Sequence, residues 1–314
     1  MHEGSRRAII AAFFANAAIA VAKLVGFVFT GAASMLAEAV HSGADSTNQL
    51  LLLMGGARGR KIADHRHPFG YGRERYFWSF VVALVIFTLG GLFALYEGIE
   101  KMRQPHEIES AAWAIGILTV AMACEAFSLR TAVRESAHAK GDQSWWHFVR
   151  HSKSPELPVV LLEDIGAMFG LALALVGVVV AQTTGNPRFD AAGSIAIGVL
   201  LVTIAVILVI EMKSLLIGEG AEPATESKIT DAMQSTASVQ SVIHLRTQYL
   251  GPEELLVAAK LAFDNTLDVP ALAAAINDVE MRVRDACPDA RVIYIEPDLA
   301  RSGPVAPTAG VTTG

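Results

Sequence analysis

Three ionisable residues, Glu38, His41 and Asp45, interrupt one apolar stretch of the chain. A charged side chain at the centre of a bilayer costs about 2.5 to 3.5 kcal/mol on insertion scales, so each needs a compensating partner. His41 and Asp45 are four residues apart, and on a helix this spacing brings their Cβ atoms within about 5 to 6 Å. An imidazole nitrogen and a carboxylate oxygen in that arrangement can bind the same divalent cation.

A second acidic pair, Glu163 and Asp164, lies early in another apolar stretch, residues 159–182. A single His–Asp pair is equally well explained by a buried hydrogen bond between two helices, because polar side chains do join transmembrane helices. Two acidic sites inside a membrane are expensive to insert, and two that face each other favour an ion site.

The elements that carry these residues have the composition of a membrane protein. Hydrophobic residues make up 53% of the 314 residues and charged residues only 18%, and the mean hydropathy is +0.42. This lies outside the usual range of soluble domains. Apolar runs of about 20 residues predict six transmembrane helices, at 8–30, 34–54, 77–99, 111–133, 158–182 and 189–213.

The basic residues near the span ends predict the orientation. The loops opposite the N-terminal side hold only Lys101, Arg103 and Arg188, whereas the N-terminal side is rich in Lys and Arg. The positive-inside rule therefore places both termini in the cytoplasm of a multi-pass protein of the cell's inner (plasma) membrane. No basic stretch is interleaved with aromatic residues, so no nucleic-acid partner is expected.

Two further segments hold possible ligands. In the loop between the second and third spans, Asp64, His65 and His67 could bind a metal, but no helix fixes their geometry and a solvated loop is the simpler interpretation. In the fourth span, Glu125 either lines a polar interior or pairs with Arg130, and the ion pair is slightly favoured.

After Lys213 the composition becomes that of a soluble domain. The pattern predicts an αββαβ order, with helices at 225–236 and 269–286 and strands at 239–249, 255–263 and 291–295. Such an order fits a small α+β domain with helices on a sheet. We expect a transmembrane domain at 1–215, a cytoplasmic αββαβ domain at 216–300, and a disordered tail at 301–314.

These features together resemble the cation diffusion facilitator family over about residues 6–298. The motifs are His41-x-x-x-Asp45, the acidic pair of the fifth span, the loop Asp64-His-Arg-His-Pro-Phe-Gly-Tyr-Gly-Arg73 and the αββαβ domain. Leu161-Leu-Glu-Asp164 and Gly185-Asn-Pro-Arg-Phe-Asp190 look most like the family's zinc transporter nine-like branch. The resemblance implies a homodimeric antiporter in the lipid bilayer that exchanges divalent cations, commonly zinc, for protons.

The resemblance also implies a transport site with two ligands from the second span and two from the fifth. His41, Asp45 and Asp164 match this pattern, but Val160 stands at the fourth position and cannot bind a metal. Glu163 is the expected substitute, although neighbouring helical residues point about 100° apart. Asn48, a water molecule or Met168 are the alternatives.

Outside the spans, the family pattern implies further metal sites. Asp64 and His67 fall on positions of a second site, where Tyr71 replaces another His. In the C-terminal domain, Lys260 and Tyr294 stand where ligands would be expected, so we predict that this domain supports dimerisation without a metal cluster.

These residues are compatible with two functional classes. In a proton-coupled exporter, protons and metal compete for the same ligands, and His41 is the natural proton carrier because imidazole titrates near neutral pH. An intramembrane metallohydrolase would need a general base, for which Glu163 could serve, but no HExxH arrangement exists. A channel is disfavoured because a tight ligand set slows ion release. We therefore expect no enzyme and no cofactor, with zinc as the cargo, or manganese, iron or cobalt, which carboxylate-rich sites also admit.

Overall fold

The computed structural model describes residues 3–30, 33–105 and 111–299. In the first two helices some side chains, those of Glu38 and His41 among them, lie outside the described part. The chain divides into two compact units, Met1–Ile217 and Gly218–Gly314. The predicted disordered tail, 301–314, lies outside the described residues.

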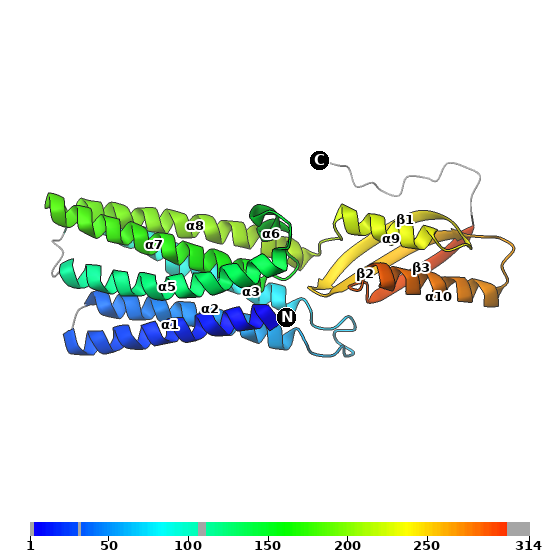
Figure 1. Cartoon of the computed structure of the whole chain (residues 1–314), viewed down its shortest axis with the longest axis horizontal. Coiled ribbons are helices and arrows are strands. Elements are labelled where there is room, and N and C mark those ends of the chain that lie inside the picture. The colour runs from blue at the N-terminus through cyan, green and yellow to red at the C-terminus, as the bar shows by residue number, and fades with distance from the viewer. Residues whose placement is uncertain (1–2, 31–32, 106–110, 300–314) are drawn as a thin grey trace. The chain divides into compact units, whose positions relative to one another are not determined.

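The first unit is a bundle of long helices that run side by side (Figure 1). Its elements are α1 (Glu3–Thr30), α2 (Ala33–Arg58), α3 (Glu74–Val85), a π-helical segment η1 (Ile86–Leu92), α4 (Phe93–Arg103), α5 (Ala111–Lys140), the short α6 (Trp145–His151), α7 (Glu156–Thr184) and α8 (Arg188–Ile217).

Four helical segments of the described residues are long and apolar enough to cross a membrane. They are Glu74–Arg103, Ala112–Lys140, Glu156–Thr184 and Arg188–Ile217, and they coincide with four of the six predicted spans. The other two predicted spans fall on α1 and α2, which the structure describes only in part. The count of six therefore stays a prediction.

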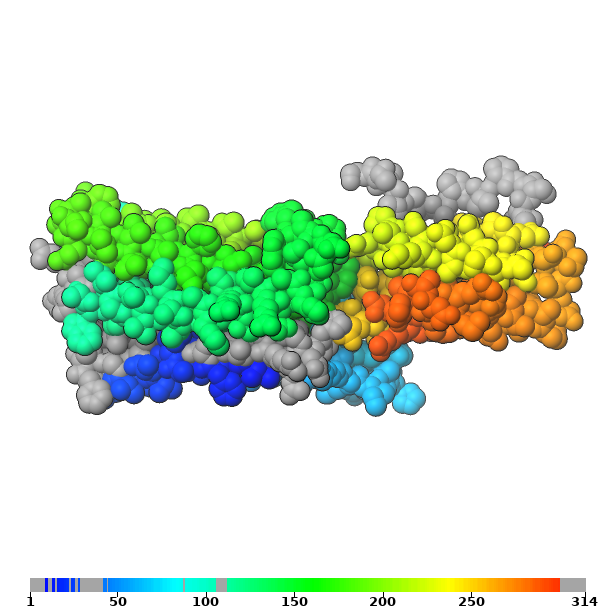
Figure 2. All heavy atoms as spheres, viewed as in Figure 1, coloured from blue at the N-terminus to red at the C-terminus, as the bar shows by residue number. Residues whose placement is uncertain are grey.

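Glycines allow the span formed by α3, η1 and α4 to pack closely on α8. A Cβ atom added at Gly91 would lie 2.7 Å from Cγ2 of Val202, and one at Gly98 would lie 2.7 Å from Cγ1 of Ile195. Small residues let transmembrane helices approach at the backbone, where dispersion contacts are densest. The atoms of α5 and α7 likewise lie against one another along one face of the bundle (Figure 2).

The second unit is a three-stranded sheet with two helices, in the predicted order αββαβ. Its elements are α9 (Pro223–Gln234), β1 (Val239–Gly251), β2 (Glu254–Phe263), α10 (Val269–Ala286) and β3 (Val292–Leu299). The central strand β2 pairs antiparallel with β1 and parallel with β3. The first helix begins at Pro223, two residues before the predicted start, because the fixed φ of proline suits the first helical position.

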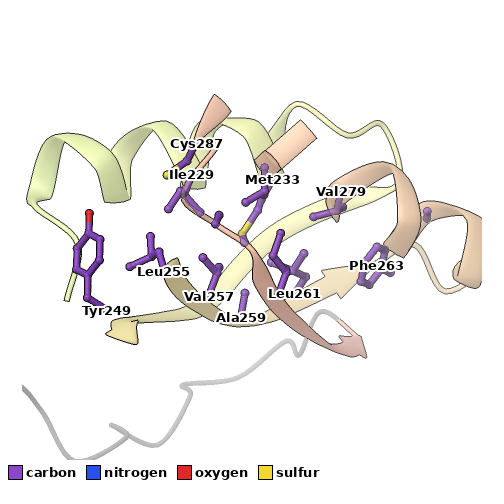
Figure 3. Packing of buried hydrophobic residues seen from close by; sticks show 14 residues of the cluster. Ile229, Met233, Tyr249, Leu255, Val257, Ala259, Leu261, Phe263, Val279 and Cys287 are labelled. Atoms are coloured by element: carbon purple, nitrogen blue, oxygen red, sulfur yellow. The ribbon is translucent and has the colours of Figure 1, made fainter. Parts of the chain in front are cut away.

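Alternate residues of β2 build the core of this unit (Figure 3). Leu255, Val257 and Leu261 are fully buried, as the two-residue period of a strand requires for one face. They pack with Ile229 of α9 and Val279 of α10, so both helices cover this face of the sheet.

Candidate ion-binding site between three helices

Helix α7 carries two adjacent buried acids, Glu163 and Asp164, which are 8% and 2% exposed. The helix follows Pro155 and ends at Gly185, which adopts the left-handed conformation (φ 67°) typical of a helix C-terminus. Two adjacent acids on one helix are both buried here because α7 packs against different neighbours on its two sides.

Asp164 faces α5. Its Oδ2 accepts a hydrogen bond from the Ser128 hydroxyl at 2.9 Å. Glu125, one helical turn earlier on α5, is also buried and interacts electrostatically with both Asp164 and Glu163. Arg130, by contrast, is exposed. The structure therefore favours a position of Glu125 in the polar interior over an ion pair between Glu125 and Arg130.

Glu163 faces α2. Its Oε1 accepts a hydrogen bond from Nδ2 of Asn48 at 3.1 Å, across 115 positions of the chain. Asp45, one turn before Asn48, interacts electrostatically with Glu163 and with Asp164. Carboxylates from α2, α5 and α7 are therefore gathered inside the bundle.

Two oxygen atoms of this cluster have no hydrogen-bond partner within the described part of the chain. Oε2 of Glu163 and Oδ1 of Asn48 are buried and accept no hydrogen bond from any residue that the structure describes. A buried acceptor without a partner costs about 1 to 3 kcal/mol, more when it is charged. Both atoms act as acceptors, and a bound cation is one kind of partner that would satisfy them.

The cluster is not a closed metal cage. Within the described part of the chain, no group of three or more His, Cys, Asp or Glu side chains is close enough to hold one ion. His41 lies in α2 one turn before Asp45, but its side chain is outside the described part, so its predicted role as a ligand stays a prediction.

The structure places neither Val160 nor the alternative donor Met168 where it could bind the cation. Val160, at the position where the family pattern has a ligand, is 1% exposed and packs in the apolar core with Leu52 and Ala205. Met168 lines a groove between α5 and α7 together with Arg130 and Arg134, where a cation would meet two positive charges.

The loop residues Asp64 and His67 lie close together but serve the loop itself. Oδ1 of Asp64 accepts from the backbone N–H groups of Arg66 and His67 at 2.9 and 2.8 Å, and Oδ2 accepts from the Tyr71 hydroxyl at 2.7 Å. The Tyr71 hydrogen bond is the main cause that lowers the pKa of Asp64. The His67 ring packs on Tyr71 with 4.2 Å between centroids. These bonds explain the loop without a metal, and the predicted second site remains a prediction.

Ser128 was not anticipated from the sequence. A signal was available, because Glu125 and Ser128 are three residues apart in an otherwise apolar span and therefore share a helix face. Asn48 was considered only as an alternative ligand, and its hydrogen bond to Glu163 could not be read from a spacing within one helix.

Residues 9–217 match the family model of the cation efflux transmembrane domain. The chain belongs to the cation efflux family. This is the family that the sequence motifs predicted, and its members are transporters rather than enzymes. The chain is accordingly a multi-pass membrane protein.

Curated relatives agree with this assignment. The mitochondrial proton-coupled zinc antiporter SLC30A9 of Xenopus laevis is 33% identical over 265 residues, which cover 83% of this chain and 47% of the relative. The Homo sapiens protein of the same name is 31% identical over 83% of this chain and 46% of its own length. Metal tolerance protein C4 of Arabidopsis thaliana is 30% identical over 84% of this chain and 58% of its own length.

The chain thus spans about half the length of these curated relatives. Among solved structures, a nickel form of the MamM CTD covers 26% of this chain and 100% of its own, with 19% identity and a TM-score of 0.24. Because the SLC30A9 relatives are mitochondrial by name, the predicted inner (plasma) membrane location stays a prediction.

Proposed function

We propose that this protein is a proton-coupled antiporter that exports a divalent cation, with zinc as its cargo. The observation that carries the proposal is the cluster of carboxylates from α2, α5 and α7, in which a buried oxygen of Glu163 and one of Asn48 have no hydrogen-bond partner among the residues that the structure describes. A removable cation explains why Glu163 and Asp164 are kept inside the membrane with only neutral hydrogen-bond donors among the described residues.

Neutral donors support this interpretation. Glu163 receives the amide of Asn48 and Asp164 receives the hydroxyl of Ser128. In the part of the chain that the structure describes, no Lys or Arg pairs with either carboxylate. Amide and hydroxyl groups orient a carboxylate but leave its charge, so the site can still attract a cation.

Coupling follows from competition for the same oxygens. A carboxylate binds metal only in its deprotonated form, so loading the metal releases protons and loading protons releases the metal. If the site opens to the two sides of the membrane in turn, this competition exchanges one cation for protons. His41, one turn from Asp45, is the residue whose imidazole would add a proton acceptor and a nitrogen ligand.

The choice of metal rests on donor chemistry. Oxygen donors with one imidazole admit Zn²⁺, and they also admit Mn²⁺, Fe²⁺ and Co²⁺. The names of the SLC30A9 relatives favour zinc. The protein acts as a homodimer in this proposal, and the C-terminal unit is the dimerisation element. Asp64 and His67 of the loop form an accessory metal site rather than the transport site.

Transport in proteoliposomes under an imposed pH gradient tests the proposal. Zinc should move across the membrane in the direction opposite to the proton flow. Manganese, iron and cobalt are tested at the same concentration for comparison. Glu97→Gln is a matched control, because Glu97 forms a surface ion pair with Lys101 (3.0 Å) away from the cluster. Metal flux that is independent of the pH gradient, or absent for all four metals, would overturn the antiporter.

A further inference from the structure

A buried ion pair joins α3 to α7 at the end of the bundle where both helices begin. Arg75 is 5% exposed and Glu156 is 1% exposed. Nε and Nη2 of Arg75 donate to the two oxygens of Glu156, and the second bond is 2.9 Å long. This bidentate arrangement fixes the orientation of the Arg75 guanidinium relative to the Glu156 carboxylate as well as the distance between them, because the two planar groups match only when they lie in one plane.

Arg75 also rests on the end of α2. A Cβ atom added at Gly59 would lie 2.8 Å from Cγ of Arg75, and one at Gly55 would lie 2.9 Å from Cβ of Trp78. The absence of side chains at these two positions lets α3 lie directly on the last turn of α2. The Arg75 side chain is therefore held between the end of α2 and the start of α7.

Helices α2 and α7 both contribute residues to the acidic cluster. Helix α2 supplies Asp45 and Asn48, and α7 supplies Glu163 and Asp164. Glu156 precedes Glu163 by seven residues, or two helical turns, so the two lie on the same face of α7. At about 1.5 Å per residue, they are separated by about 10 Å along the helix axis, a length over which a helix moves as one body.

We propose that Arg75 is a positioning residue for ion binding, which acts through Glu156 to fix α7 against α2. The pair sets the separation of Asn48 from Glu163, and hence the spacing of the oxygens that receive the cation. This inference rests on the proposed function and extends it to two residues outside the acidic cluster.

The test uses the full-length protein in proteoliposomes with Arg75→Met and Glu156→Met combined. Replacing a buried ion pair by apolar residues of similar size is often neutral or stabilising, so the double variant should remain folded, as judged by its melting temperature and elution volume. Its apparent KM for zinc should rise by about tenfold while the rate at saturating zinc is retained. A matched double variant, Arg150→Met with Glu211→Met, removes an ion pair between α6 and α8, and its KM should not change.

Arg75→Lys provides an independent arm, because it keeps the charge but loses the bidentate geometry. It should raise the KM by a smaller factor without lowering the melting temperature. If the double variant fails to fold, the KM of Arg75→Lys decides: an increase supports positioning, and a wild-type value overturns it. A wild-type KM in a folded double variant also overturns it while leaving the antiporter intact, whereas absence of transport by the wild type would refute the antiporter itself.

Discussion

Two groups of acidic side chains in this protein have different kinds of partner, a charged lysine in one and neutral hydrogen-bond donors in the other. In the C-terminal unit, Nζ of Lys260 lies 2.7 Å from Glu296 and 3.1 Å from Asp298, so the protein supplies its own cation. In the helical bundle, Glu163 and Asp164 receive only an amide and a hydroxyl among the residues that the structure describes.

The difference teaches what distinguishes a structural acid from one that can bind cargo. An ammonium group neutralises a carboxylate permanently, because it is covalently attached and always present. A hydroxyl or amide donor orients the carboxylate and leaves its charge for an exchangeable ion. In the sheet, Lys260 of β2 pairs with His244 of β1 on one side and with Glu296 of β3 on the other. The lysine therefore occupies a position where a metal ion could otherwise lie between potential ligands.

The largest expected effect is the loss of transport when the bundle cluster is broken. Alanine at Asp45, Asp164 or His41 should abolish zinc flux in proteoliposomes, because each substitution removes a ligand of the proposed site. The folded dimer should be retained, as size-exclusion chromatography would show. Normal transport by Asp45→Ala would contradict the site.

Glu163→Gln separates the two roles of that carboxylate. Glutamine keeps the size and the acceptor for Asn48 but ligates metal weakly, so the apparent KM for zinc should rise by about tenfold and selectivity among metals should change. Transport assays over a range of metal concentrations measure both. An unchanged KM together with a lower melting temperature would instead mark Glu163 as structural.

Lys260→His removes the internal cation from the acids of the sheet and adds an imidazole to the row that already contains His244 and Glu296. We expect calorimetry to detect micromolar zinc binding that depends on this substitution, with Lys260→Met as the control that removes the charge only. If the same stoichiometry is found for Lys260→His and the wild type, then the lysine does not exclude metal.

The smallest effect is expected at the loop. The hydrogen bond from Tyr71 lowers the pKa of Asp64, so the carboxylate contributes stability that is present above its ordinary pKa of 3.8 and is lost as the pH falls through the depressed value. Tyr71→Phe should raise the pKa of Asp64 and leave zinc transport at neutral pH unchanged. An NMR titration of the loop measures the first effect. A transport defect in Tyr71→Phe would show that the loop does more than hold its own shape.

Local patterns predicted much of this protein. The strand and helix order of the C-terminal unit followed from two- and 3.6-residue periods, and its helix and strand boundaries were missed by only a few residues, as at Pro223. The short helix α6 was not predicted, because its seven residues, capped by Ser144, are too few for a period to appear. The sequence singled out Glu163 and Asp164, which the structure buries, because ionisable residues in apolar stretches are conspicuous in any sequence, whereas Asp45 is only half-buried.

What the sequence determined by itself was therefore the family, the chemical type of the donors and the helices that carry them. The tertiary structure decided their partners: Glu163 with Asn48 across 115 positions, Arg75 with Glu156 across 81, and Lys260 with the acids of β3. The rotation and depth of one helix against another decide these pairings. They are set by packing, as where Gly59 admits Arg75 or Val160 enters the apolar core, and no spacing within a single element encodes them.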